Sequence, residues 1–102
     1  MIKHIVLLRF KSELIPALVN EHEIQFQALG AKIPEILGLE WGLNVSTEGL
    51  TKGFSHCFHL CFKDAETRDR YLVHPEHQGF SESIKPSLED VLVVDYEIDE
   101  TI

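Results

Sequence analysis

Residues 2–10 read Ile-Lys-His-Ile-Val-Leu-Leu-Arg-Phe, and this stretch decides the fold. Its β-branched and large apolar residues predict a β-strand. Apolar side chains fall on both faces of that strand, with Val6 and Leu8 on one face and Ile5 on the other. A strand of this kind is typically central in a sheet and covered on both sides. We therefore expect a sheet whose two faces are both buried in the assembled protein.

A helix is predicted directly after this strand. Its apolar stripe runs at helical spacing from Ile15 to Ile33. Ser12 can cap the start of the helix, and Pro16 is tolerated only in its first turn. Pro34 ends it, because the residue before a proline disfavours the helical conformation.

Three further strands and a broken helix complete a single domain over residues 1–102. The strands are expected over residues 37–45, 54–62 and 90–98, and the second helix breaks after Leu72 and restarts at Pro75. Two β-α-β units with right-handed crossovers predict an α+β, ferredoxin-like βαββαβ protomer, a four-stranded antiparallel sheet with helices on one face. We expect the first and third strands to be central, parallel neighbours.

The second face of this sheet has no helix to cover it. The strands carry apolar side chains on both faces, with Val6 and Leu8 against Ile5 and Leu7, so this second face would form a patch that soluble monomers avoid. Two copies that pair sheet to sheet would bury the patch. We therefore predict a homodimer, a dimeric α/β barrel whose paired sheets enclose a common interior.

The composition limits the other partners. The formal net charge is -8, and the nine Lys and Arg residues are scattered along the chain. This charge argues against nucleic acid and against an anionic membrane surface. The apolar run at the N-terminus is too short to span a bilayer and lacks a cleavage site, so we expect a cytoplasmic protein.

The two cysteines, Cys57 and Cys61, are not expected to form a disulfide. On one strand their Cα atoms would be roughly 13 Å apart. A disulfide requires Cα atoms within about 7 Å of each other. Two free thiols are typical of a reducing compartment.

Four titratable residues form the candidate catalytic group. His4 and His56 are each the third residue of an expected strand, and in parallel neighbours both would lie on one face at one end of the sheet. His77 is the third residue of the helix that opens at Pro75, where the helix dipole favours a neutral imidazole that can act as a base. Tyr71 precedes the helix break. Each of these residues also has a purely structural interpretation, as a hydrogen-bonded or packed side chain.

We expect no metal and no cofactor. His74 and His77 have a spacing that could place both rings on one side, but no third ligand can be assigned, and His74 is expected to cap the helix. The chain has no glycine-rich phosphate loop, no nucleophile elbow and no His-Glu-x-x-His motif.

Five short motifs extend over nearly the whole chain: Ile2-Lys3-His4; Trp41-Gly42-x-Asn44-Val45 with Glu48-Gly49-Leu50; Lys52-Gly53-Phe54-Ser55-His56; Tyr71-x-x-His74-Pro75-x-His77-x-x-Phe80; and Val93-x-Asp95-Tyr96. Together they resemble the stress-responsive A/B barrel family, small dimeric α+β barrel proteins. The resemblance implies a ferredoxin-like protomer that pairs through its sheets, in agreement with the patch argument.

The resemblance also implies candidate roles. Most members of the family have no assigned activity, and some are plant stress proteins. One member is a plant enzyme that closes a linear polyketide by intramolecular aldol condensation without cofactor or metal. By local motif match, its catalytic tyrosine and histidine fall on Tyr71 and His77, and two further active-site histidines fall on His4 and His56.

Two hypotheses about function follow. In the first, the protein is a cofactor-independent cyclase or isomerase for a small, apolar, polyketide-like carbonyl compound. His77 abstracts a proton, Tyr71 donates a hydrogen bond to the enolate oxygen, and the other two histidines orient the substrate. In the alternative, it is a non-catalytic stress-response or small-molecule-binding protein. A hollow at the helix-free face of the sheet, lined by all four residues, favours the first hypothesis. A monooxygenase is a third hypothesis, from fold analogy alone.

Overall fold

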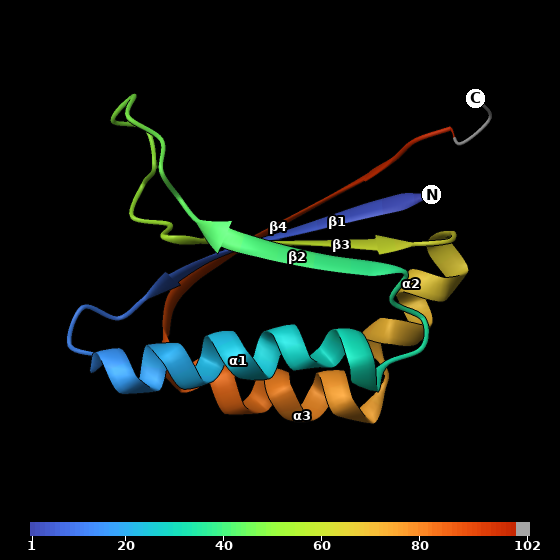
Figure 1. Cartoon of the computed structure of the whole chain (residues 1–102), viewed down its shortest axis with the longest axis horizontal. Coiled ribbons are helices and arrows are strands. Elements are labelled where there is room, and N and C mark those ends of the chain that lie inside the picture. The colour runs from blue at the N-terminus through green and yellow to red at the C-terminus, as the bar shows by residue number, and fades with distance from the viewer. Residues whose placement is uncertain (100–102) are drawn as a thin grey trace.

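A computed structural model describes residues 1–99 of the chain. Its elements are β1 (Ile2–Phe10), α1 (Pro16–Lys32), β2 (Gly38–Leu43), β3 (His56–Phe62), α2 (Ala65–Leu72), α3 (Pro75–Ile84), the short 3-10 helix η1 (Lys85–Ser87) and β4 (Leu88–Glu97). The sheet has the order β2-β3-β1-β4, and every neighbouring pair is antiparallel. The helices lie on one side of the sheet (Figure 1). The predicted α+β, ferredoxin-like protomer is therefore confirmed.

The direction of the two central strands differs from the prediction. β1 and β3 are neighbours, but His4 pairs with Leu60 and His56 pairs with Leu8 in an antiparallel register. The prediction of parallel neighbours was wrong. In the first β-α-β unit β1 and β2 are the parallel strands, and β3 lies between them and runs back from the end of β2.

The start of α1 also differs from the prediction. Pro16 is the first helical residue, and the preceding residue, Ile15, makes no side-chain capping hydrogen bond. Ser12 lies outside the helix, and Ile15 is 63% exposed instead of lying on the buried stripe. Proline has its φ angle already set for a helix and lacks the N–H that a first turn cannot use. The helix therefore begins at Pro16 and not at Ser12.

The core lies between the helices and the sheet. Phe26 of α1 stacks on Phe58 of β3, with ring centroids 3.9 Å apart and planes 4° from parallel. Leu60 and Phe62 of β3 and Ile33 at the end of α1 are fully buried. Burial of a side chain of this size stabilises the fold by about 2 kcal/mol. This packing fixes the height of the helices above the sheet.

The opposite face of the sheet carries no helix among the residues described (Figure 1). By the β1–β4 register this face contains Ile5 and Leu7 of β1 together with Leu92, Val94 and Tyr96 of β4. The three β4 side chains are 46% to 47% exposed. We call this surface the uncovered face. The predicted apolar patch is therefore present on the protomer.

Cys57 and Cys61 are both free, as the strand spacing predicts. Within residues 1–99, no helix has the length and apolar character needed to cross a membrane.

Candidate active site

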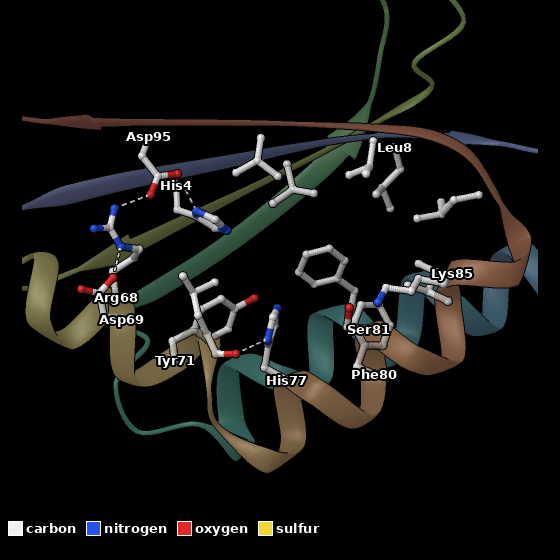
Figure 2. A pocket seen from close by; sticks show the side chains of 17 residues that line it. His4, Leu8, Arg68, Asp69, Tyr71, His77, Phe80, Ser81, Lys85 and Asp95 are labelled. Atoms are coloured by element: carbon white, nitrogen blue, oxygen red, sulfur yellow. Dashed lines mark hydrogen bonds and ion pairs between the residues drawn. The ribbon is translucent and has the colours of Figure 1, made fainter.

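A cavity of about 650 Å³ lies between the sheet and the helices (Figure 2). Its volume suits a small organic molecule. Its wall on the sheet side comes from β1 and β4, and its wall on the helix side comes mainly from α2 and α3, with further contributions from α1 and η1. The lining includes His4, Val6, Leu8, Arg68, Tyr71, His77, Phe80, Ser81, Ile84, Lys85, Leu88, Val91, Val93 and Asp95.

The cavity is not where the sequence analysis placed a hollow. His4 alternates along β1 with Ile5, so its side chain faces the helices and not the uncovered face. A hollow at the uncovered face, which would have favoured the catalytic hypothesis, is therefore not lined by His4. Three of the candidate side chains instead meet inside a single protomer, because α2 and α3 bring Tyr71 and His77 against the helix side of the sheet, which carries His4.

His77 is held in one tautomer by the backbone. Its Nδ1 lies 3.1 Å from the carbonyl oxygen of Leu72, and a carbonyl oxygen can only accept a hydrogen bond. Nδ1 therefore carries the hydrogen, and the lone pair of Nε2 is free. Burial lowers the pKa of His77, and the nearby His4 and His74 lower it further, whereas the hydrogen bond to Leu72 raises it. The ring is neutral at pH 7 and can act as a base.

Tyr71 lies beside this base. Its ring centroid is 4.4 Å from that of His77, and only 1% of the residue is exposed. The hydroxyl points into the cavity (Figure 2) and has no hydrogen-bond partner among the residues described. Burial raises the pKa of Tyr71, so the hydroxyl stays protonated at neutral pH. It can therefore donate a hydrogen bond to a ligand oxygen.

His4 extends from the sheet wall toward the same space. Its Nδ1 is 2.6 Å from Oδ1 of Asp95 on β4, and its ring centroid is 5.8 Å from that of Tyr71. Arg68 of α2 donates to the other carboxylate oxygen of Asp95 at 2.7 Å. A carboxylate that binds a guanidinium accepts the hydrogen of Nδ1, which leaves Nε2 of His4 turned to the cavity (Figure 2).

His56 is not part of this group. It pairs with Leu8, four residues along β1 from His4, which is roughly 13 Å along the strand. Its Nε2 is 2.6 Å from Oε2 of Glu23, and its Nδ1 is 2.6 Å from Oγ of Ser55. Both ring nitrogens are thus used, and the ring stacks on Trp41 with 9° between the planes. The structure brings together His4, Tyr71 and His77, and it separates His56 from them.

The other histidines have structural contacts. His74 precedes α3, and its Nδ1 accepts from the backbone N–H of Glu76 at 3.1 Å, which confirms the predicted cap. His22 is buried and bonds the hydroxyl of Ser87 at 2.9 Å. Within the part of the chain that is described, no three His, Cys, Asp or Glu side chains converge on a position for a metal ion.

Asp95 and Arg68 are the site residues that the sequence analysis did not assign. Asp95 belongs to the closing motif, and its place opposite His4 depends on the pairing of β1 with β4. Arg68 lies 27 residues earlier in the sequence and meets Asp95 only through the packing of α2. The closing motif was a signal for Asp95, but the local sequence contains none for Arg68.

With this geometry in place, comparison with known proteins shows the family. The sequence model of a family described as "Stress responsive A/B Barrel Domain" matches residues 2–98 of this chain. The chain belongs to this family.

Its relatives include two named plant proteins. This A/B barrel domain is 30% identical to olivetolic acid cyclase of Cannabis sativa over 95 residues, which are 93% of this chain and 94% of the relative. It is 34% identical to the stress-response A/B barrel domain-containing protein HS1 of Arabidopsis thaliana, over 93% of this chain and 87% of the relative.

Solved structures share the fold over nearly the whole domain. The hydroxynitrile lyase of Passiflora edulis superposes with a TM-score of 0.90 at 25% identity, covering 99% of this chain and 95% of the lyase. A dimeric ferredoxin-like protein of unknown function from Thermobifida fusca gives a TM-score of 0.79 at 26% identity, over 95% of this chain and 90% of that chain. Proteins similar to this chain in sequence or in structure thus include a cyclase, a lyase and a dimer of unknown function.

Proposed function

We propose that this A/B barrel domain is a cofactor-independent cyclase or lyase that acts on a small, apolar carbonyl compound. The observation that supports this proposal most strongly is the pairing of His77 and Tyr71 in the cavity. His77 offers a free Nε2 lone pair, and Tyr71 offers a protonated hydroxyl beside it. One relative is a cyclase and one structural neighbour is a lyase, and both names fit acid–base chemistry on a small molecule.

The proposed reaction begins with proton transfer. Nε2 of His77 takes a proton from the carbon next to a carbonyl group, and the electron pair of that C–H bond moves onto the carbonyl oxygen. Tyr71 donates a hydrogen bond to this oxygen as its negative charge develops. In a ring closure, the enolate carbon then bonds to a second carbonyl carbon of the same molecule. His77 returns its proton to the resulting alkoxide, so no oxidant or added nucleophile is consumed.

His4 is proposed to orient the substrate. The Asp95 carboxylate holds its ring, and Nε2 faces the same space as the Tyr71 hydroxyl. The remaining walls are apolar and include Val6, Val93 and Phe80. They favour a substrate whose body is hydrocarbon and whose few oxygen atoms lie near the two histidines.

The protomer is proposed to act as a homodimer in the cytoplasm. The uncovered face exposes Leu92, Val94 and Tyr96 on one strand, and a second copy of the sheet would cover them. The dimeric neighbour from Thermobifida fusca supports this assembly. The two free cysteines agree with a reducing compartment.

The second candidate function is non-catalytic binding of a small molecule. The same cavity, and the relative that is named only for a stress response, favour it. The two functions differ in what His77 does. In a binding protein, substitution of one wall residue changes affinity modestly, whereas in the enzyme it removes turnover.

A screen of small apolar di- and tricarbonyl compounds tests the proposal. We expect wild-type protein to consume at least one of them without added cofactor. His77→Gln should reduce the rate at least about 100-fold, since general base catalysis contributes that much or more. Lys32→Gln, an exposed substitution away from the cavity, is the control and should keep full activity. Consumption that is equally fast with His77→Gln would contradict the assignment of the base.

A further inference from the structure

We propose that Lys85 and Ser81 form an anion-binding subsite in the cavity, and that the ligand carries a carboxylate group that binds there. The subsite lies at the opposite end of the cavity from Arg68 and Asp95 (Figure 2). The inference rests on the cavity being the ligand site, as in the proposed function. It adds a charged group to the substrate class and assigns the residues that select it.

Helix geometry sets the distance between the subsite and the base. His77, Ser81 and Lys85 are spaced by four residues, so they lie on one face of α3 and its continuation, and all three line the cavity. Eight residues at 1.5 Å per residue separate His77 from Lys85 by about 12 Å along the axis. The side chain of Lys85 reaches back toward Ser81 (Figure 2), which shortens the gap. A ligand that contacts both His77 and the Lys85 ammonium must still extend along the helix axis past Ser81.

The charges around the cavity leave Lys85 available. The two acidic residues of the lining, Asp69 and Asp95, are both bonded to Arg68. Lys85 contacts Glu82 at 3.5 Å, but Glu82 does not line the cavity, and the two side chains are 65% and 78% exposed. Exposed pairs of this kind contribute less than about 1 kcal/mol. Lys85 can therefore give up its contact with Glu82 and bind a ligand carboxylate at little cost in free energy.

Ser81 supplies the second donor. Its hydroxyl lines the cavity beside the Lys85 ammonium (Figure 2) and has no hydrogen-bond partner among residues 1–99. A carboxylate has two oxygens and accepts from both an ammonium and a hydroxyl group. Phe80, Ile84 and Leu88 line the wall near these donors. The chemistry fits an organic carboxylate with an apolar body, with the anion at Lys85 and the reactive carbonyl at His77.

Isothermal titration calorimetry at neutral pH tests the subsite. The probes are unbranched carboxylic acids of increasing length and the primary alcohols of the same lengths. At the best length we expect wild-type protein to bind the acid at least about 10-fold more tightly than the alcohol, a difference of about 1.4 kcal/mol. Lys85→Gln should lose this preference, and Ser81→Ala should reduce it. Glu82→Gln should increase it, because a competing carboxylate is removed.

Controls separate this inference from the proposed function. Lys32→Gln removes another exposed lysine, which has one weak ion partner outside the cavity, and it should keep the preference. His77→Gln should also keep it, since this substitution replaces a neutral imidazole and removes no charge from the cavity. A preference that depends on Lys85 supports the subsite even when no turnover is found. Equal affinity for acids and alcohols in wild-type protein, or a preference that persists in folded Lys85→Gln, would overturn the subsite and leave the base assignment standing.

Discussion

His77 donates its Nδ1 hydrogen to the backbone carbonyl oxygen of Leu72 across 3.1 Å. The break between α2 and α3 makes this contact available. The last carbonyl groups of a helix have no partner within it, and the N–H of Glu76 is already bonded to His74. The backbone therefore selects the tautomer of His77 and turns its basic nitrogen toward the cavity. A local interruption of the helix thus orients the candidate base.

The pH dependence of activity should report this base. Burial lowers the pKa of His77 from its ordinary 6.5. We expect kcat/KM to fall as the lone pair of Nε2 is protonated, with the midpoint of this acid limb below pH 6.5. The folded state also binds this proton less readily than the unfolded chain. The resulting stability is complete above pH 6.5 and is lost as the pH falls through the lowered pKa.

Initial rates measured across pH, with unfolding followed at the same pH values, check both statements. His77→Gln should lack that part of the pH dependence of stability. An acid limb centred at or above pH 6.5 would contradict a buried, neutral base.

Tyr71→Phe should separate catalysis from stability. The hydroxyl has no partner within residues 1–99, so its removal should change the free energy of unfolding by less than about 0.5 kcal/mol. If the hydroxyl stabilises the enolate oxygen, kcat should fall about 100-fold, as it does when one oxyanion donor is removed. Steady-state kinetics and urea unfolding measure the two effects. A variant that unfolds more easily but turns over at the wild-type rate would give Tyr71 a structural role only.

Substitution of His56, in contrast to Tyr71→Phe, should reduce the stability of the fold. Its substitution by alanine leaves the Glu23 carboxylate, whose side chain is 17% exposed, without its histidine partner. Removing one member of a buried pair of this kind destabilises a protein by about 3 kcal/mol. We expect His56→Ala to lower the urea midpoint strongly, with the fluorescence of the single tryptophan, Trp41, as the probe. His77→Gln is the matched histidine control and should unfold near the wild-type midpoint.

The uncovered face provides the test of assembly. The double substitution Leu92→Glu with Val94→Glu places two charges on this face and should yield a folded monomer. Ile24→Glu is the control, because Ile24 is 61% exposed on α1 and lies outside the uncovered face. Sedimentation equilibrium distinguishes the two states. A wild-type protein that sediments as a monomer would contradict the homodimer.

Elements with local signals could be predicted from the sequence. Asp64 caps α2 by accepting from the N–H of Thr67 at 2.9 Å, and Pro75 occupies the first position of α3, its expected place. The apolar residues on both faces of β1 also indicated that the sheet has an apolar face without helices, although burial of Val6 and Leu8 in the structure decides which face that is. In α1 the same kind of reasoning failed, because the sequence offered two starting signals and Pro16 prevailed over Ser12.

The composition of the site depended on contacts that no local pattern contains. His4 and His56 look equivalent in the sequence, but their strands run in opposite directions, so the two rings lie at different ends of the sheet. Arg68 and Asp95 meet through the packing of α2 near the edge strand β4. Only the strand register and the helix placement decide such neighbours. Tyr71 and His77 could be paired from the sequence because a single short helix break separates them.

In the proposed reaction His77 removes a proton from a carbon next to a carbonyl group. Deuterium exchange measures this step without knowledge of the final product. Apolar ketones are incubated with the protein in heavy water, and NMR follows the loss of the signals of the protons next to the carbonyl. We expect wild-type protein to accelerate exchange above the buffer rate and His77→Gln to abolish the acceleration. Exchange at the buffer rate with wild-type protein, or unchanged acceleration with folded His77→Gln, would contradict the claim.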